Sequence, residues 1–314
     1  MKQGIAYGAL AGASWGLIFL PPALLPEVSP LLLTCGRFAT YGMLAAILLI
    51  PQWRSIARIW SHRDLLTLIR LSMMSNILYF LLVAAAVQQV GIAATSLVIG
   101  LIPVVVPLFG RREQHAPPLR QLFLPMAAIV AGVALINLHA QQQTAHHVMG
   151  IKNQVSGMFC ASAALLCWSR YAVDNSRCLK KIRYDSNQWS LLIGLCTGCI
   201  SMLLWLIARY CGFSDVDLPL TESAQTLFWV TNVVLAVVSS WLGYLAWNLC
   251  SLRLPVSLIG QMVVFETLFA LFYGFIYLQR FPDLKESAAI VLLLGGVLAS
   301  VHSHQRNGRV QVTA

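Results

Sequence analysis

The sequence predicts an all-α membrane protein of ten transmembrane helices, arranged as two inverted five-helix repeats. Three observations lead to this fold class: an apolar composition, apolar segments of bilayer-spanning length, and a second half that repeats the first. The chain of 314 residues is 58% hydrophobic and 10% charged, with a mean hydropathy of +0.74. About a quarter of the residues in soluble proteins are charged. The composition therefore places this chain in a lipid bilayer.

Ten apolar segments approach the roughly 20 residues that a transmembrane helix needs. The connections between them are short and polar, so we expect no soluble domain. The first segment continues well past residues 11–13, which superficially resemble a cleavage site, and we expect an uncleaved helix. The ten segments cover residues 4–23, 30–50, 65–87, 92–110, 121–138, 154–172, 188–208, 225–248, 256–278 and 287–303.

The second half of the chain repeats the first in segment order and in scattered identities. An offset of 163 residues places Gly132 on Gly295, and an offset of 153 places Trp15 on Trp168. We therefore expect one repeat in residues 1–150 and the other in residues 151–314. Because each repeat has five segments, an odd number, the second repeat enters the membrane inverted. Such duplication is typical of secondary transporters.

The positions of Lys and Arg predict the orientation. With a cytoplasmic N-terminus, the inside connections hold 14 of these residues and the outside connections hold 4. Cytoplasmic loops carry such an excess. We therefore expect a multi-pass protein of the cell membrane, the bacterial inner membrane, with both termini cytoplasmic. Topology explains the net charge of +10 without a nucleic-acid partner. The inside residues are Lys2, Arg54, Arg58, Arg63, Arg111, Arg112, Arg120, Arg177, Lys180, Lys181, Arg183, Arg253, Arg306 and Arg309, and the outside ones are Lys152, Arg209, Arg280 and Lys285.

Glycine recurs at every fourth residue of the first segment, at Gly4, Gly8, Gly12 and Gly16. A face of such small residues lets a neighbouring transmembrane helix approach closely. We interpret this face as a packing surface.

Polar and aromatic side chains recur along single faces of the third, sixth and eighth segments. Residues three, four or seven apart share one helical face. These faces fit either a cavity for an amphipathic solute or contacts between helices and interfacial anchors. The candidate binding residues are Asn76 and Tyr79 in the third segment, Trp168 and Tyr171 in the sixth, and Trp241, Tyr244 and Asn248 in the eighth, with Trp15 as the repeat partner of Trp168.

The fourth segment contains Pro103 and Pro107. Each proline removes a backbone donor, which leaves the carbonyl groups of Ile99 and Pro103 without their helical partners. Unpaired carbonyl groups at membrane depth persist only against protein or a watery cavity. A kink beside a central pathway and a simple packing bend both fit this pattern, and Pro103 is a further candidate binding residue.

Glu266 lies in the middle of the ninth segment, at the repeat position of Pro103. A charged side chain near the bilayer centre costs about 2.5 to 3.5 kcal/mol on translocon scales unless it is paired, hydrated or neutralised. Three roles stay open: a proton-coupling group, a partner for a solute ammonium group, and a structural pair with an arginine such as Arg37. Gln261 lies about 140° around the same helix, so we expect one of the two to pack.

No catalytic constellation or metal-ligand spacing stands out. The eight cysteines lie mostly within apolar segments and show no repeated ligand pattern. We expect neither an enzyme nor a metal or cofactor.

Several short motifs together resemble a known family. They include the Ser-Trp-Gly turn at residues 14–16, Arg37 with Phe38, Pro103, and the glycine-led runs at residues 132–136 and 295–298. The pattern is similar to EamA-type ten-helix members of the drug/metabolite transporter superfamily. The resemblance covers almost the whole chain.

That resemblance implies alternating-access transport of small metabolites, often amino acids and usually outward. It also implies a cavity lined by segments 1, 3, 4, 6, 8 and 9, with segment 2 outside it. We expect an exporter of amino acids or similar amphipathic solutes, with protons as a candidate coupling ion. A broad-specificity drug efflux carrier, or a membrane scaffold or sensor without flux, are the alternatives.

Overall fold

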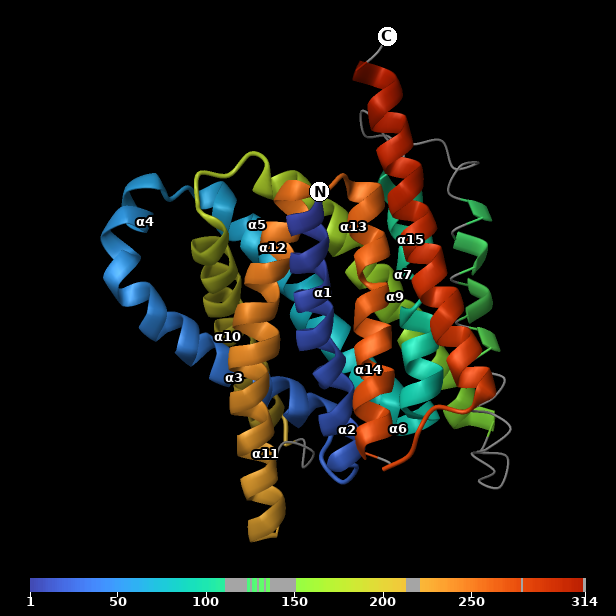
Figure 1. Cartoon of the computed structure of the whole chain (residues 1–314). Coiled ribbons are helices and arrows are strands. Elements are labelled where there is room, and N and C mark those ends of the chain that lie inside the picture. Colours follow the sequence, from blue (N-terminus) through green and yellow to red (C-terminus); the bar gives the residue numbers. More distant parts are fainter. Residues whose placement is uncertain are drawn as a thin grey trace.

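The computed structural model describes residues 1–110, 123–124, 126–128, 130–132, 134–135, 151–212, 221–277 and 279–312. Every regular element within these ranges is helical, and the helices pack into one bundle (Figure 1). The all-α prediction is confirmed.

Helices of the first half continue into one another through short turns and wider π-helical stretches. They are α1 (Lys2–Gly16), the 3₁₀ turn η1 (Leu17–Phe19), α2 (Leu20–Leu24), α3 (Pro30–Leu49), the 3₁₀ turn η2 (Ile50–Gln52), α4 (Trp53–Ile59), α5 (His62–Ser72), the π-helical η3 (Met73–Ile77), α6 (Leu78–Ile99) and α7 (Ile102–Gly110).

The second half follows a similar order. Its elements are α9 (Ile151–Leu179), α10 (Ser186–Tyr210), α11 (Glu222–Val234), the π-helical η5 (Leu235–Leu242), α12 (Gly243–Arg253), α13 (Val256–Met262), α14 (Val264–Tyr277) and α15 (Leu284–Val312).

Local sequence explains where several helices begin. Ser29 accepts a hydrogen bond from the backbone of Leu32 and is followed by Pro30, whose fixed φ suits the first helical position of α3. Asp185 and Gln188 form a reciprocal capping box at the start of α10. These caps satisfy backbone donors at points where the chain turns back into the bundle.

Six helical stretches are long and apolar enough to cross a membrane within the described ranges. The predicted count of ten is therefore not established, and 8 of the 18 residues of the predicted fifth segment lie outside the described residues. The six stretches are Lys2–Leu24, Pro30–Ile59, His62–Ile92, Ser186–Tyr210, Glu222–Arg253 and Leu258–Tyr277.

The helices are interrupted at corresponding places in the two halves. The helical hydrogen bonding breaks at residues 100–101, between α6 and α7, and at Val263, between α13 and α14. Adding the repeat offset of 163 residues to the first break gives the position of the second. The same offset shifts the residue numbers of η3 into the range of η5. A further break occurs at Gly91, whose φ of 84° is readily adopted by glycine, between the predicted third and fourth segments.

The two halves interleave through close helix contacts. The glycine face of α1 packs on α13 and α14, where a Cβ atom at Gly12 would lie 2.5 Å from the Cβ of Phe265 and 2.7 Å from the backbone nitrogen of Glu266. Gly42 of α3 and Gly198 of α10 bring a second pair of helices together in the same way. The contacts of α1 confirm the packing role predicted for its glycine face.

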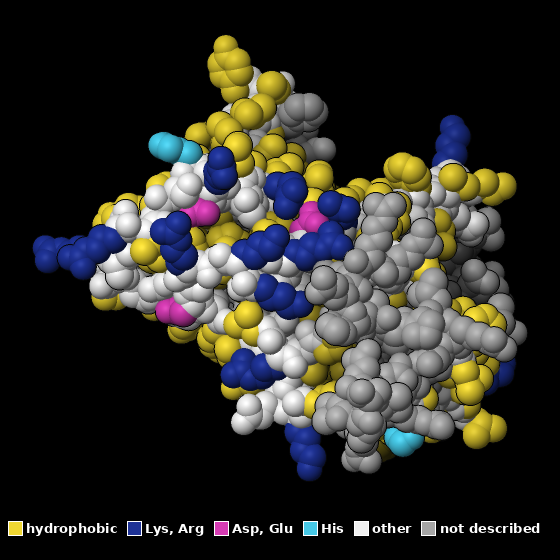
Figure 2. All heavy atoms as spheres, turned by 90° about the horizontal axis from the view of Figure 1, so that it is seen from above, with side chains coloured by type: hydrophobic (Ala, Val, Ile, Leu, Met, Phe, Trp, Pro, Cys, Tyr) yellow, Lys and Arg dark blue, Asp and Glu magenta, His cyan; other side chains and the backbone are white. Residues whose placement is uncertain are grey.

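Both the start of α1 and the end of α15 lie at one end of the bundle, which we call the terminal end (Figure 1). The turn between α4 and α5 and the turn between α9 and α10 lie there too. Figure 2 looks onto this end and shows Lys and Arg side chains gathered across it. Termini on one side fit an even number of membrane crossings.

Candidate functional site

A small enclosed cavity lies in the interior, between helices of both halves. Its volume is about 10 Å³, on the order of the space that one water molecule needs. Five of its ten lining residues were predicted as binding residues. The cavity is lined by Trp15, Ile18, Arg37, Phe38, Ser75, Tyr79, Phe80, Trp168, Tyr244 and Glu266.

Glu266 supplies the acidic group of this cavity. It lies in the first turn of α14, where the positive end of the helix dipole favours an anion. Its side chain is 1% exposed, and its Oε1 accepts a hydrogen bond of 3.3 Å from the hydroxyl of Tyr79. Its Oε2 has no hydrogen-bond partner within the described part of the chain. One carboxylate oxygen is therefore available to a ligand or a proton.

Arg37 supplies the basic group. Its guanidinium group donates to Ser240 Oγ at 3.4 Å from Nε and 3.3 Å from Nη2. The same group lies over the rings of Phe38 and Phe80, with its central carbon 4.8 and 4.4 Å from their centroids. Such contacts stabilise a cation without a carboxylate partner.

Arg37 and Glu266 line one cavity, but no ion pair joins them in the described structure. The direct structural pair, one of the three predicted roles for Glu266, is not formed. The resemblance implied that the second segment lies outside the solute cavity, yet Arg37 and Phe38 of α3 reach the lining of this central cavity. The fourth segment, in contrast, adds no residue to this lining.

Aromatic side chains form one side of the central cavity, which we call the aromatic wall, and Trp15 lies at its centre. Its ring centroid lies 5.6 Å from that of Trp168, 5.5 Å from Tyr244 and 5.2 Å from Trp247. Tyr171 extends the cluster, 6.0 Å from both Trp168 and Tyr244, although it does not line the cavity. Edge-on and tilted aromatic pairs of this kind hold one another in place.

The two π-helical stretches anchor this wall. Trp15 Nε1 donates to the backbone oxygen of Ser239 in η5 at 2.9 Å, and the Tyr244 hydroxyl donates to the backbone oxygen of Ser75 in η3 at 3.2 Å. Tyr244 also bonds to Oδ1 of Asn76. A π-helical turn is wider than an α-helical one and is frequent at functional sites. Each stretch thus receives an aromatic side chain from the other half.

Asn76 therefore lies behind Tyr244, and its Nδ2 donates to Thr197 Oγ1 at 2.8 Å. The remaining predicted residues lie away from the cavity. Trp241 donates from Nε1 to Asn187 Oδ1 at 2.9 Å. Asn248 accepts from Asn175 Nδ2 at 3.0 Å. Only Tyr244 of the predicted eighth-segment face reaches the cavity: Trp241 lies within η5, and Asn248 lies one turn beyond Tyr244 on α12.

Pro103 is joined to the ninth segment rather than to the cavity. Its carbonyl oxygen, which Pro107 leaves without a helical donor, accepts a hydrogen bond of 2.8 Å from Gln261 Nε2. Gln261 is fully buried. We expected either Gln261 or Glu266 to pack, because they point to different sides of the predicted helix. Gln261 is the one that packs, and it satisfies the carbonyl group of Pro103.

Four lining residues, Ile18, Arg37, Phe38 and Ser75, were not predicted to line the cavity, whereas Phe80 lies on the predicted third-segment face with Asn76 and Tyr79. A signal for Arg37 exists in the sequence, since a charge within an apolar segment is itself a functional hypothesis. The helical spacing from Asn76 is the signal for Phe80, whereas nothing in the sequence distinguishes Ile18 from other apolar residues of its helix.

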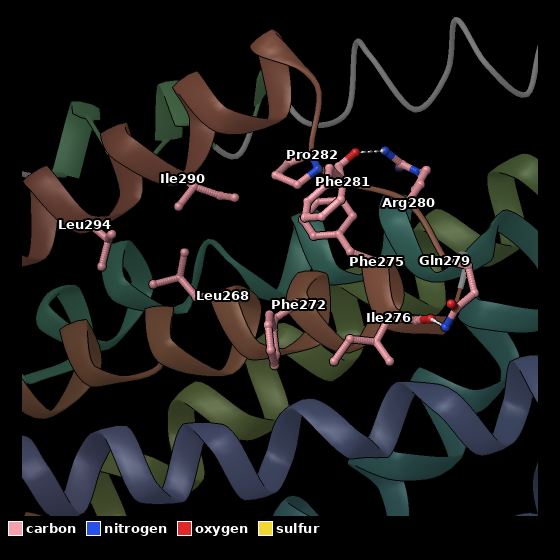
Figure 3. A pocket seen from close by; sticks show the side chains of 10 residues that line it. All are labelled: Leu268, Phe272, Phe275, Ile276, Gln279, Arg280, Phe281, Pro282, Ile290 and Leu294. Carbon is pink, nitrogen blue, oxygen red and sulfur yellow. Dashed lines mark hydrogen bonds between the residues drawn. The ribbon is translucent and has the colours of Figure 1, made fainter.

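A larger hollow of about 540 Å³ lies between α14 and α15, near the turn that joins them (Figure 3). Phe272, Phe275 and Phe281 form much of its apolar lining. Arg280 lies at its edge and forms two hydrogen bonds of 2.6 Å to Glu286. None of the predicted binding residues lines this hollow, so the predicted residues converge on the central cavity instead.

Comparison with known proteins agrees with this architecture. The EamA-like transporter family matches residues 2–138. A solved crystal structure superposes with a TM-score of 0.73 over 98% of this chain and 99% of its own, at 18% identity, which shows a shared fold. The inner membrane protein YtfF of Escherichia coli (strain K12) is 33% identical over 313 residues, covering 96% of each chain. The family match and the identity to an inner membrane protein over nearly the full length together show that this chain belongs to the EamA-like transporter family, and hence that it is a multi-pass membrane transporter of the drug/metabolite superfamily.

Proposed function

We propose that this transporter exports small amphipathic solutes, amino acids foremost, by alternating access, with the central cavity as the solute site. The observation that carries the proposal is the presence of Arg37 and Glu266 in one aromatic-lined cavity. Buried charges within membrane helices are rare and are commonly functional. A site with one base and one acid matches a solute that carries both charges.

Each group of the site has a partner in an amino acid. A guanidinium group binds a carboxylate through its planar fork of donors, as Arg37 would bind the solute carboxylate. Glu266 would bind the α-ammonium group through its unpartnered oxygen. Trp15, Trp168 and Tyr244 would surround the solute side chain, since aromatic faces accept apolar groups and cations alike.

The small volume of the cavity supports a conformation without solute, in which the cavity has collapsed between the solute-bound states of the cycle. About 10 Å³ leaves no room for an amino acid, so binding requires the two halves to separate. At the terminal end they are joined by polar contacts, including a bond of 2.6 Å from the Tyr41 hydroxyl to the Ser190 carbonyl and an ion pair of 3.5 Å between Arg70 and Asp174. Contacts of this type can exchange for water as the bundle opens.

Interrupted helices at related positions also support a transport cycle. The breaks before α7 and before α14 are related by the repeat offset, and Glu266 follows the second break directly. Discontinuous helices at the repeat interface commonly form the substrate and ion sites of secondary transporters. We propose residues 1–150 and 151–314 as the two repeats whose relative motion opens the cavity.

Competition at Glu266 gives the proposed cycle its direction. A proton and a solute ammonium group both require the same carboxylate, so binding of one favours release of the other. Coupling requires only that the proton affinity differ between the inward-open and outward-open states. Exchange of one solute for incoming protons would then drive export.

Counterflow in proteoliposomes tests the function. Preloaded phenylalanine should exchange with labelled phenylalanine, whereas phenethylamine, which lacks the carboxylate, should exchange poorly. The Arg37→Gln variant should lose this preference, because it removes the partner of the carboxylate. Equal exchange of both compounds by the unmodified protein would instead favour broad drug efflux, and no exchange across amino-acid, amine and drug panels would favour a scaffold.

A further inference from the structure

Another hollow, separate from the central cavity and from the hollow between α14 and α15, opens at the terminal end of the bundle. Its volume is about 550 Å³, and it lies between the corner that joins α4 to α5 and the turn that joins α9 to α10. We call it the basic pocket. It is lined by Ile59, Ser61, Arg63, Asp64, Thr67, Arg177, Cys178, Lys181, Ile182, Arg183, Tyr184 and Trp189.

Four of these lining residues are cationic, and Asp64 is the one acid among them. Arg177 is held 4.0 Å from Asp174. Arg63, Lys181 and Arg183 are exposed and form no ion pair within the described part of the chain. The basic pocket therefore carries excess positive charge in a confined space, where the field of several like charges favours an anion.

The inner wall of the basic pocket is fixed in place. The hydroxyl of Tyr184 donates to Asp64 Oδ2 at 2.8 Å, and the Tyr184 ring stacks on Trp189 with centroids 5.9 Å apart. Both aromatic residues are buried. The bond also occupies Asp64, which caps the start of α5. The one acid of the lining is thus engaged in structure, while its cations extend toward solvent.

An apolar groove borders the same elements. Its volume is about 300 Å³, and it lies between α5 and α10, beside the same corner. Its lining includes Trp60, Leu65 and Leu203, all of them exposed. The basic pocket and the apolar groove share α5, α10 and the corner between α4 and α5. Together they match the two parts of one molecule, a phosphate-bearing headgroup and an acyl chain.

We propose that the basic pocket and the adjoining groove bind an anionic phospholipid of the membrane leaflet that surrounds the terminal end. The location fits, because α5 begins and α9 ends at this level, where the chain leaves the apolar part of the bundle. Basic pockets between transmembrane helices are suited to anionic headgroups. Such a lipid would connect α5 of the first half to α9 and α10 of the second, beside the contacts that close this end.

Lipid retention measured by native mass spectrometry tests the proposal. Purified protein in detergent is titrated with dioleoylphosphatidylglycerol or with the zwitterionic dioleoylphosphatidylcholine. We expect preferential retention of phosphatidylglycerol. The double variant Arg63→Gln/Lys181→Gln should bind it more weakly by roughly fivefold per removed charge, or about 30-fold for the pair.

The matched control is Arg54→Gln/Arg58→Gln. These two arginines lie on α4 at the same end of the bundle and are exposed, but they do not line the basic pocket. The control should retain the lipid as the unmodified protein does. An equal loss of phosphatidylglycerol binding in both double variants would mean that only the overall charge matters, and it would overturn the proposal. Equal retention of phosphatidylglycerol and phosphatidylcholine by the unmodified protein would overturn it too.

A soluble ligand is distinguished by a third titration with glycerol 1-phosphate, which has the phosphate but no acyl chain. The lipid proposal predicts that it displaces phosphatidylglycerol only weakly. Displacement as effective as that by the lipid itself would assign the basic pocket to a free phosphate compound instead. Melting curves in phosphatidylcholine micelles verify that both double variants are folded.

Discussion

At the residue scale, the central site depends on two buried ionisable side chains with different surroundings. Arg37 is satisfied by Ser240 and two aromatic rings, whereas Glu266 keeps one oxygen without a protein partner. An unpartnered polar atom at such burial is costly to the folded state. An unpartnered oxygen at this position is explained if a proton or a solute occupies it during transport.

The first prediction concerns Glu266→Gln. Gln resembles the protonated carboxyl group but releases no proton, so the variant should lose accumulation driven by a pH gradient. Exchange of solute should persist at a higher half-saturating concentration, because an amide binds an ammonium group less well than a carboxylate does. Transport in proteoliposomes with and without an imposed gradient provides the measurement. Tyr79→Phe, which removes only the bond to Glu266, is the control that should keep the coupling.

A second prediction concerns Gln261→Met. Methionine has a similar volume but cannot donate to the carbonyl of Pro103, so a buried acceptor loses its partner. We expect a loss of about 1 to 3 kcal/mol of stability. Thermal unfolding in detergent measures it. An unchanged melting temperature would mean that water replaces the amide.

At the element scale, the helices that form the site are those that depart from regular α-helix. The π-helical stretches η3 and η5 each accept an aromatic side chain from the other half through a backbone carbonyl. The break before α14 places Glu266 in a first helical turn. Irregular backbone thus supplies both the hydrogen-bond acceptors and the favourable dipole of the site.

Close approach of α1 to α14 leads to a third prediction. Gly12→Ala places a Cβ atom against Phe265 and the backbone of Glu266, so the helices must move apart. We expect a destabilisation of about 1 to 3 kcal/mol from overpacking, together with impaired transport. Gly274→Ala on α14 is the matched control, because a Cβ atom there meets no other atom within 4 Å. Equal melting temperatures for the two variants would contradict the packing argument.

The start of α15 gives a prediction for pH. Hydrogen bonds from Arg280 hold the pKa of Glu286 below its usual value. The carboxylate therefore stabilises the folded state fully above its unfolded pKa of about 4.3. That stability is lost as the pH falls through the folded pKa. Glu286→Gln should lower the melting temperature at neutral pH, and the difference from the unmodified protein should shrink on acidification. A pH-independent difference would exclude this linkage.

At the scale of the whole molecule, the two halves share one interior. Helices α1 and α3 of the first half pack on α14 and α10 of the second, and the cavity takes residues from both. A relative motion of the halves would therefore change the proposed solute site directly. This arrangement is what an alternating-access carrier requires.

The fifth prediction concerns orientation. In a cysteine-depleted background, Lys180→Cys should react with a membrane-impermeant thiol reagent only from the cytoplasmic side, and Lys285→Cys only from outside. The reason is the asymmetry of Lys and Arg along the sequence. Labelling of intact cells and of inverted vesicles gives the answer. The reverse pattern would place the basic pocket in the outer leaflet.

Several features could be predicted from the sequence because they depend on local chemistry. Apolar length and composition determine the all-α membrane class. Glycine at every fourth residue of the first helix predicts close packing, and the close contacts at Gly12 confirm it. A charge in an apolar segment identifies Glu266, and helical angle separates it from Gln261, which packs on Pro103.

Other features depend on the tertiary structure alone. Which residues share the cavity depends on how helices from both halves cross, and sequence spacing carries no information about that crossing. Arg37 reaches the lining for this reason, whereas Asn248 bonds to Asn175 instead. The π-helical stretch η5 changes the register of its helix, so Trp241 and Tyr244 no longer share the face that regular spacing predicts. Sequence therefore determined the elements and their chemistry, and packing decided which side chains meet.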